Sequence, residues 1–224
     1  ENMGFPAEYT PGTRPQDWVP TSLIRLQQAP LLPQWAECRP FVLPAADACD
    51  APPHPAYDEA AGSEFHAYAQ EVYDTGRSLT EEQKLIARFW SDDPMLSPTP
   101  AGHWIAIVLQ IADRDALPVE VVSATLAKLG VAQADAFISC WSTKFRYNLL
   151  RPVTYIRRHI DPAWEPLLIT PPFPEYTSGH STQSGAAATV LAAMLGEDFA
   201  FDDETHVDDD LPVRRFPSFA AAAE

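Results

Sequence analysis

The sequence has few basic residues. Lys and Arg total 15 against 31 Asp and Glu, which gives a formal net charge of -16. Such a surface repels the phosphate backbone of DNA and RNA, so we exclude nucleic-acid binding through a broad basic face. Long apolar runs are missing too. The longest candidates, residues 104–112 and 185–195, are shorter than the ~18 apolar residues that a membrane helix needs, and we expect no membrane span.

Signals for a cellular compartment are also scarce. The chain does not open with a basic segment followed by an apolar run, so we expect no signal peptide within it. Its first residue is Glu1 rather than Met, which leaves room for the removal of an upstream segment. We favour an exported location over a cytoplasmic one and leave the compartment open.

Cysteine is rare, with three residues in the chain. No Cys and His pair has the spacing of a zinc finger, so the sequence gives no reason to expect a structural zinc site. Cys38 and Cys49 flank a proline-containing loop, and two interpretations stay open. Either these two are reduced thiols, as Cys140 is expected to be, or they form one local disulfide in an exported protein.

The residues that are abundant indicate a helical globular protein. Hydrophobic residues make up 46% of the 224 positions, an ordinary share for a packed domain. A large share of the 23 prolines lies in residues 1–57. We interpret this segment as an extended arm, because proline fixes the backbone and removes a hydrogen-bond donor. Residues 58–224 are the predicted helical domain.

Helical periodicity dominates this second region, and we predict an all-α helical bundle. Thr80 and Gln83 have the spacing of a capping box that opens a helix. The one strand signal, at residues 41–43, is short and isolated. The predicted helices cover residues around 65–73, then 81–90, 103–113, 118–150, 153–160 and 178–195. His103 opens a buried helix, and we interpret it as a core histidine rather than a pocket residue.

Two cations stand close together near the end of the longest predicted helix. Lys144 and Arg151 are seven residues apart, so on a helix they would differ by only about 20° around the axis. Trp141 and Asn148 would share that face. A guanidinium and an ammonium side by side match a tetrahedral oxyanion. The alternative is that both cations pair with carboxylates on a solvated face.

A second cluster lies where a proline-rich loop turns into a small-residue helix. The first turn of a helix has free N–H groups and a positive dipole end, which favour a bound anion. Ser178 adds a hydroxyl, and Gly179 lets the backbone approach a ligand without a Cβ. His180 could act as an acid or base on an oxygen of the bound anion. Taken alone, the same residues could be a plain helix cap with a surface histidine.

Together the two clusters resemble the superfamily of phosphatidic acid phosphatase type 2 (PAP2) and vanadium-dependent haloperoxidase. The resemblance rests on a Lys, six residues, Arg-Pro, and a later Ser-Gly-His at a helix start. It implies an α-helical fold with a pocket for vanadate, or for phosphate as substrate or analogue. Lys144 and Arg151 would bind the equatorial oxygens, Ser178 and Gly179 further oxygens. His180 would be the acid–base residue, and Lys144 would also polarise bound peroxide.

The resemblance also implies residues around that pocket. Trp141 and Phe173 are similar to residues of the haloperoxidase halide pocket. Within the segment 89–93, Asp93 best matches an aspartate that supports an active-site arginine. Asn148 is a further supporting residue on the predicted helix face.

One expected part of the pattern is not found. The superfamily carries a third motif, an Arg followed by the His that binds vanadium, after the Ser-Gly-His helix. His206 follows, but in an acidic loop, and Arg214 and Arg215 are expected in a solvated loop. Residues 218–224 look like an N-cap and the first turns of a new helix. We therefore expect that the chain stops before the third motif, which lies in a missing or separate C-terminal segment, and that no vanadium-ligating His is present here.

Three functions stay open at this point. The favoured one is a haloperoxidase-like enzyme that oxidises halide with hydrogen peroxide at bound vanadate. The second is a PAP2-type acid phosphatase that hydrolyses a small phosphoester through a phosphohistidine. The third is a non-catalytic fragment with an incomplete site. Homo-oligomer formation is left open.

Overall fold

The computed structural model describes residues 9–10, 12–23, 29–92 and 98–224. The chain divides into two compact units, and two of the boundaries between them fall inside helices. The predicted division at residue 57 stays a prediction. Unit 1 consists of Glu1–Arg39, Ala45–Lys84 and Ile138–Thr177, and unit 2 of Pro40–Pro44, Leu85–Phe137 and Ser178–Glu224.

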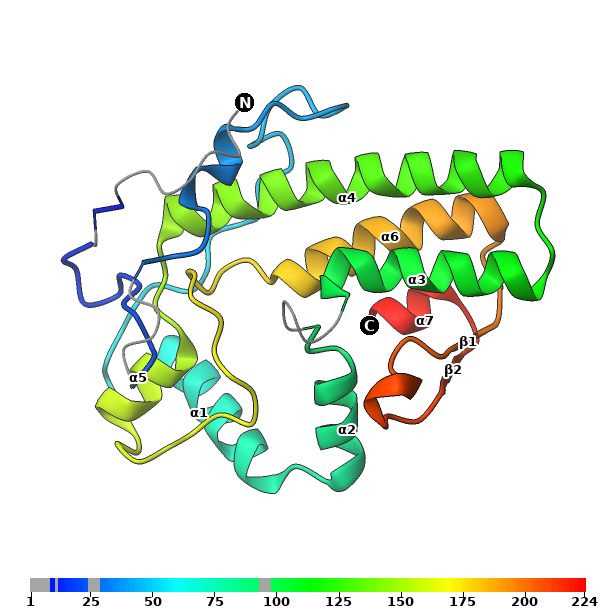
Figure 1. The fold of residues 1–224 in the computed structure, drawn as a ribbon. Coiled ribbons are helices and arrows are strands. Elements are labelled where there is room, and N and C mark those ends of the chain that lie inside the picture. Colours follow the sequence, from blue (N-terminus) through cyan, green and yellow to red (C-terminus); the bar gives the residue numbers. More distant parts are fainter. Residues whose placement is uncertain (1–8, 11, 24–28, 93–97) are drawn as a thin grey trace. The chain divides into compact units, whose positions relative to one another are not determined.

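The predicted all-α class is confirmed, since helices make up most of the regular structure (Figure 1). One two-stranded sheet was not predicted, and residues 41–43 form no strand. The α-helices are α1 (Glu64–Ser78), α2 (Glu81–Phe89), α3 (Thr99–Arg114), α4 (Val119–Tyr147), α5 (Pro152–His159), α6 (Gly179–Leu195) and α7 (Phe219–Ala223). The remaining elements are the 3-10 helices η1 (Pro33–Glu37) and η2 (Val207–Asp209) and the strands β1 (Phe201–Asp203) and β2 (Arg214–Phe216).

Helix starts follow the local sequence signals. The Gln83 N–H donates to Thr80 Oγ1 at 3.2 Å, and Gln83 Oε1 accepts from the Thr80 N–H at 2.9 Å, so the predicted capping box is formed. The Ser178 hydroxyl caps α6 and the Ser218 hydroxyl caps α7, each accepting the N–H three residues on. These starts were predictable because each depends on side chains within one helical turn.

The core of unit 2 lies between α3, α6, α7 and the strands. Trp104, Ile107 and Ile111 form the buried face of α3. Helices α3 and α6 lie side by side (Figure 1), and the small alanine side chains of α6 permit a close approach. Phe219 stacks on Phe201 with ring centroids 5.0 Å apart, which joins α7 to β1. A helix as short as α7 is marginal in isolation. Its buried contacts in this core therefore stabilise it.

The core of unit 1 lies between α1 and α5. Tyr155 and Ile156 of α5 are buried against Ala69 of α1, together with Leu149 and Leu150 from the segment between α4 and α5. The arm contributes to this unit as well, because Trp18 is 1% exposed. Residues 152–159 form the predicted short helix, and the proline-rich stretch that follows is a loop, as expected.

The predicted end of the longest helix is wrong. We expected it to reach residue 150, but α4 ends at Tyr147 and Asn148 has the left-handed φ of 50°. Asparagine tolerates this conformation, which commonly ends helices. The next residues pair with the arm, since the Leu150 N–H donates to Gln16 O at 2.8 Å. Arg151 occupies the N-cap position of α5, so it lies outside α4 and, contrary to the prediction from the sequence, does not share a helix face with Lys144.

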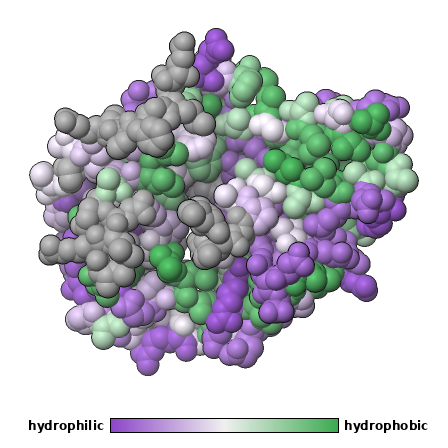
Figure 2. Space-filling view, in the orientation of Figure 1, coloured by the Kyte–Doolittle hydropathy of each residue, from purple (hydrophilic) through white to green (hydrophobic). Residues whose placement is uncertain are grey.

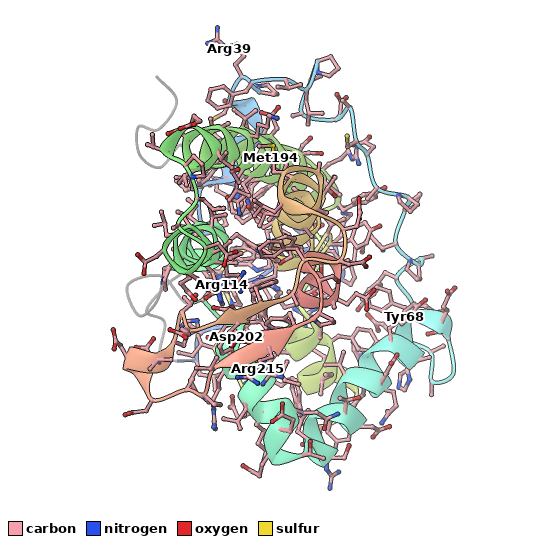
Figure 3. The ribbon with its side chains drawn as sticks, turned by 90° about the vertical axis from the view of Figure 1, so that its right-hand side faces the viewer. Arg39, Tyr68, Arg114, Met194, Asp202 and Arg215 are labelled. Atoms are coloured by element: carbon pink, nitrogen blue, oxygen red, sulfur yellow. The ribbon has the colours of Figure 1, made fainter. Side chains whose placement is uncertain are left out.

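The predicted loop around residues 214–215 is also wrong. These residues form β2, which pairs with β1 in antiparallel register. Asp202 and Arg215 stand opposite each other on the two strands (Figure 3), with Arg215 Nε 3.1 Å from Asp202 Oδ1. Arg214 lies with its Cζ 5.7 Å from the centroid of the Phe89 ring. Both arginines therefore have partners within the unit rather than water alone.

Among the described residues, α4 is the one helix long and apolar enough to cross a membrane. In its apolar stretch, 28% of the residues are buried. A single helix of this kind is weak evidence for a membrane span, because the core helices of soluble proteins share its composition. Figure 2 shows hydrophobic residues gathered over α3 and the first half of α4, where Ile105, Leu109 and Val119 are exposed. All three cysteines are free thiols, so the disulfide interpretation of Cys38 and Cys49 is not supported.

Candidate functional site

Lys144 is a buried cation in unit 1. Its side chain comes from the last turn of α4, and only 1% of the residue is exposed. The Nζ atom donates to the backbone oxygens of Pro174 and Glu175, both at 2.9 Å. Burial lowers the pKa of Lys144 to about 8. In the described part of the chain no carboxylate lies within hydrogen-bond distance of this ammonium, so it is positioned without being neutralised.

Arg151 binds the same loop from the start of α5. Its Nε donates to Phe173 O at 2.7 Å and its Nη2 to Pro171 O at 3.2 Å. The Nη1 atom pairs with Glu175 Oε2 at 2.8 Å. The two cations thus converge on residues 171–175 from different elements, although they share no helix face. The sequence left open that both cations pair with carboxylates on a solvated face. Arg151 does pair with one carboxylate, that of Glu175, whereas Lys144 is buried and binds backbone oxygens instead.

Trp141 and Phe173 lie beside these cations. Their ring centroids are 5.0 Å apart, and Lys144 Nζ is 5.0 Å from the centroid of Phe173. Arg151 Cζ is 4.6 Å from the same centroid. Such distances are in the range of cation–π attraction. Lys144, Arg151, Trp141, Phe173 and Glu175 are called the cationic cluster below.

The cationic cluster has an excess of positive charge, with two cations and one carboxylate. It also has spare donors. An ammonium has three N–H bonds and a guanidinium five, whereas two and three respectively are used in the hydrogen bonds described. Cations with unused donors and, within the part of the chain that the structure describes, no second carboxylate favour an anionic ligand. The residues present therefore fit an oxyanion such as vanadate or phosphate.

Asn148 and Asp93 were predicted to support the cationic site. Asn148 Oδ1 accepts from the Tyr9 hydroxyl at 2.9 Å, so its side chain contacts the arm. This differs from the predicted position on a face shared with Lys144, because α4 ends one residue earlier. Asp93 lies outside the described residues.

Ser178, Gly179 and His180 belong to unit 2. Ser178 is the N-cap of α6, and Gly179 is its first residue, where backbone N–H groups have no partner within the helix. The His180 side chain is exposed, and its Nε2 lies 3.1 Å from Ser91 O. The helix start therefore has the predicted chemistry for an anion. That these groups share one pocket with Lys144 and Arg151 stays a prediction.

Unit 2 also contains a group of histidines and carboxylates that was not predicted from the sequence. His103 is confirmed as a core residue: its Nδ1 is 3.0 Å from both oxygens of Asp92, and its Nε2 is 2.8 Å from Asp203 Oδ2. His206 was expected in an acidic loop and was given no role; it is 3% exposed, with Nε2 3.2 Å from Asp92 Oδ1. Asp92, His103, Asp203, His206 and Asp209 are called the histidine cluster below.

The carboxylates of the histidine cluster determine its charge state. Burial lowers the pKa of His103, but hydrogen bonds to Asp203 and Asp92 outweigh this and raise it to about 9. The hydrogen bond from His103 correspondingly lowers the pKa of Asp203, against the effect of burial. The only signal in the sequence was the acidic segment after β1, and acidic segments are usually solvated surface.

Comparisons with known proteins agree on one superfamily. The family model of the vanadium chloroperoxidase (VCPO) second helical-bundle domain matches residues 124–163 and 159–223. The vanadium chloroperoxidase of Curvularia inaequalis is 32% identical over 143 residues, which are 53% of this chain and 23% of that protein. The chain thus spans about a quarter of this curated relative.

Solved structures show the fold. The first bacterial vanadium-dependent iodoperoxidase matches with a TM-score of 0.88 and 44% identity, over 95% of this chain and 53% of that one. A bacterial vanadium-dependent chloroperoxidase in its apo form matches with a TM-score of 0.70 and 17% identity, over 96% of this chain and 57% of that one. At that identity the second likeness shows the fold alone. The chain spans about half the length of both.

Proposed function

Because the chain belongs to the superfamily of vanadium-dependent haloperoxidases and PAP2-type phosphatases, we propose that it acts in a haloperoxidase, oxidising halide with hydrogen peroxide at bound vanadate. The single observation that carries the proposal is the buried Lys144 ammonium, held by carbonyl oxygens and without a carboxylate partner among the described residues. A buried charge of this kind is costly unless a ligand compensates it.

We propose that Lys144, Arg151, Ser178 and Gly179 hold the vanadate. Lys144 is still protonated at neutral pH, since its pKa is about 8, so it supplies a positive charge and a spare N–H donor. The two spare N–H donors of Arg151 are compatible with bidentate binding of an oxyanion. The Ser178 hydroxyl and the Gly179 N–H supply neutral donors at the helix end. This set rests on the superfamily resemblance together with the local geometry of each unit.

Bound vanadate supplies the centre at which peroxide is activated for the two-electron oxidation of halide. The chain's own residues act around that centre. Lys144 and Arg151 stabilise negative charge where it develops on oxygen. His180 holds or accepts a proton at its ring, which suits the protonation steps of peroxide binding. Its exposed position gives that proton a route to solvent.

We propose that Trp141 and Phe173 form the side of the site that receives halide. Their rings lie over Lys144 and Arg151, so they shield the cations from water and strengthen the cations' electrostatic effect. Iodide is the halide to test first, because the relative that is 44% identical is an iodoperoxidase.

The experiment that tests this proposal is an assay of the full-length protein with peroxide, halide and a halogen-accepting dye, with and without orthovanadate. We expect dye halogenation that requires both vanadate and halide and that falls in the Arg151→Ala variant. Hydrolysis of p-nitrophenyl phosphate, inhibited by vanadate and without halogenation, would instead assign the site to a phosphatase. Neither activity, together with unchanged vanadate binding in Arg151→Ala, would contradict the proposed site.

A further inference from the structure

We propose that Asp92, His103 and His206 bind one divalent metal ion of the zinc type in the interior of unit 2. One donor atom from each residue lies within 4.8 Å of the others. The three residues are 2%, 0% and 3% exposed, so the site is enclosed by the unit itself. Imidazole nitrogen with carboxylate oxygen is a donor set that Zn²⁺ accepts. This site is separate from the proposed vanadate ligands and does not depend on them.

The outer sides of both rings are arranged as metal-ligating histidines usually are. His103 presents Nδ1 to Asp92 and places Nε2 2.8 Å from Asp203 Oδ2. His206 presents Nε2 to Asp92 and places Nδ1 2.9 Å from Asp209 Oδ2. A histidine that binds a metal typically donates its other ring N–H to a carboxylate, which orients the ring and makes it a better ligand. Both candidate ligands have such a carboxylate.

The carboxylates around the two rings favour a cation between them. All four ring nitrogens face carboxylate oxygens, so both buried rings lie in negatively charged surroundings. A divalent ion bound to the inner nitrogens, His103 Nδ1 and His206 Nε2, would balance the negative charge of Asp92, while each outer ring nitrogen keeps its carboxylate partner.

The surroundings indicate a structural site with protein donors alone. Both oxygens of Asp92 are 3.0 Å from His103 Nδ1, so this carboxylate can bind through two atoms and complete four donors, the usual number for structural zinc. Trp90 stacks on His103 with ring centroids 4.5 Å apart, and the Phe89 ring packs edge-on against His206 with centroids 5.1 Å apart. Asp92 is also held at a left-handed φ of 46°, a strained backbone conformation of the kind that clusters at functional sites.

The test uses the whole purified chain, freed of metals with a chelator and titrated with Zn²⁺ alone. We expect one Zn²⁺ per chain, with release of protons, and a visible absorption spectrum of four-coordinate Co²⁺ when cobalt replaces zinc. His206→Gln should abolish stoichiometric binding, whereas His66→Gln, which changes a histidine of α1, should leave it intact.

A milder pair of variants keeps the proposal testable if His206→Gln does not fold. The Asp209 side chain is 50% exposed, so Asp209→Asn should fold, yet it removes the carboxylate behind His206. We expect zinc affinity to fall about 10–100-fold in Asp209→Asn and to stay unchanged in Asp208→Asn, the exposed neighbour. Equal affinities in these two variants, or no stoichiometric zinc in the unaltered chain, would overturn the proposal.

Discussion

The cationic cluster of unit 1 and the histidine cluster of unit 2 bury charge in two different ways. Lys144 and Arg151 are held mainly by backbone oxygens of residues 171–175. Arg151 also pairs with the one carboxylate of the cluster, that of Glu175. The rings of His103 and His206 face three carboxylates instead. Carbonyl oxygens position a cation without cancelling its charge, whereas carboxylates cancel it. The first cluster is therefore suited to an anion and the second to a cation.

The largest expected effect comes from breaking the histidine cluster. Asp203→Asn leaves His103 in the core without one of its two charge partners. Removing one partner of a buried ion pair typically costs about 3–5 kcal/mol. We expect a loss of that size in the free energy of unfolding of the metal-free chain, measured by urea denaturation.

The neighbouring residue on β1 provides the control. Asp202 pairs with Arg215 at the surface, with the two side chains 44% and 83% exposed. Exposed pairs contribute about 0–1 kcal/mol, so Asp202→Asn should change stability little. Similar losses in both variants would show that burial of Asp203 is not the cause.

The two clusters should respond to pH in opposite directions. The pKa of His103 is raised from 6.5 to about 9, so its contribution to stability is fully present below pH 6.5 and is lost as pH rises through 9. The pKa of Lys144 is lowered from 10.5 to about 8, so the folded chain releases this proton first and stability rises between pH 8 and 10.5. Each effect should amount to at most about 3 kcal/mol.

Denaturation of the metal-free chain at several pH values measures this difference, and a variant separates the two contributions. Lys144→Met should remove the rise in stability above pH 8. It should leave the fall in stability between pH 6.5 and 9, which comes from His103. If the variant and the unaltered chain show the same profile above pH 8, the Lys144 ammonium is not desolvated as described.

Anion binding tests the cationic cluster directly. Lys144→Met and Arg151→Lys each remove charge-assisted hydrogen bonds, worth about 1.5–3 kcal/mol, so vanadate affinity should fall about 10–100-fold in either variant. Calorimetric titration or vanadium NMR measures this affinity. Lys128→Met removes an exposed lysine of α4 and should have no effect. An equal loss of vanadate affinity in Lys128→Met would show that the net charge of the chain, rather than the cationic cluster, causes the effect.

The smallest expected effect compares two helix caps. Ser178 and Ser218 cap α6 and α7 by the same hydrogen bond, at 3.2 and 3.1 Å. Ser178→Ala and Ser218→Ala should each cost about 1 kcal/mol of stability. Only Ser178→Ala should weaken vanadate binding as well, and unchanged binding would restrict Ser178 to its role as a cap.

Sequence reasoning succeeded where the cause was local. The capping box at Thr80 and Gln83 and the starts of α6 and α7 depend on residues within one turn of each other. It failed at the end of α4, because residues 148–150 pair with the arm more than 100 positions away. It also gave His206 in the acidic loop no role, because no local pattern shows that Asp92 and Phe89 pack around it.

The amino-acid sequence by itself determined the helical class, most helix starts, the strong negative charge and the superfamily pattern of Lys144, Arg151 and the Ser-Gly-His segment. Only the tertiary structure decided which charged groups lose contact with water and which atoms they face. It buried Lys144 against carbonyl oxygens and enclosed His103 among carboxylates. Periodicity and capping act over a few residues, whereas desolvation and charge pairing depend on segments that meet only after folding.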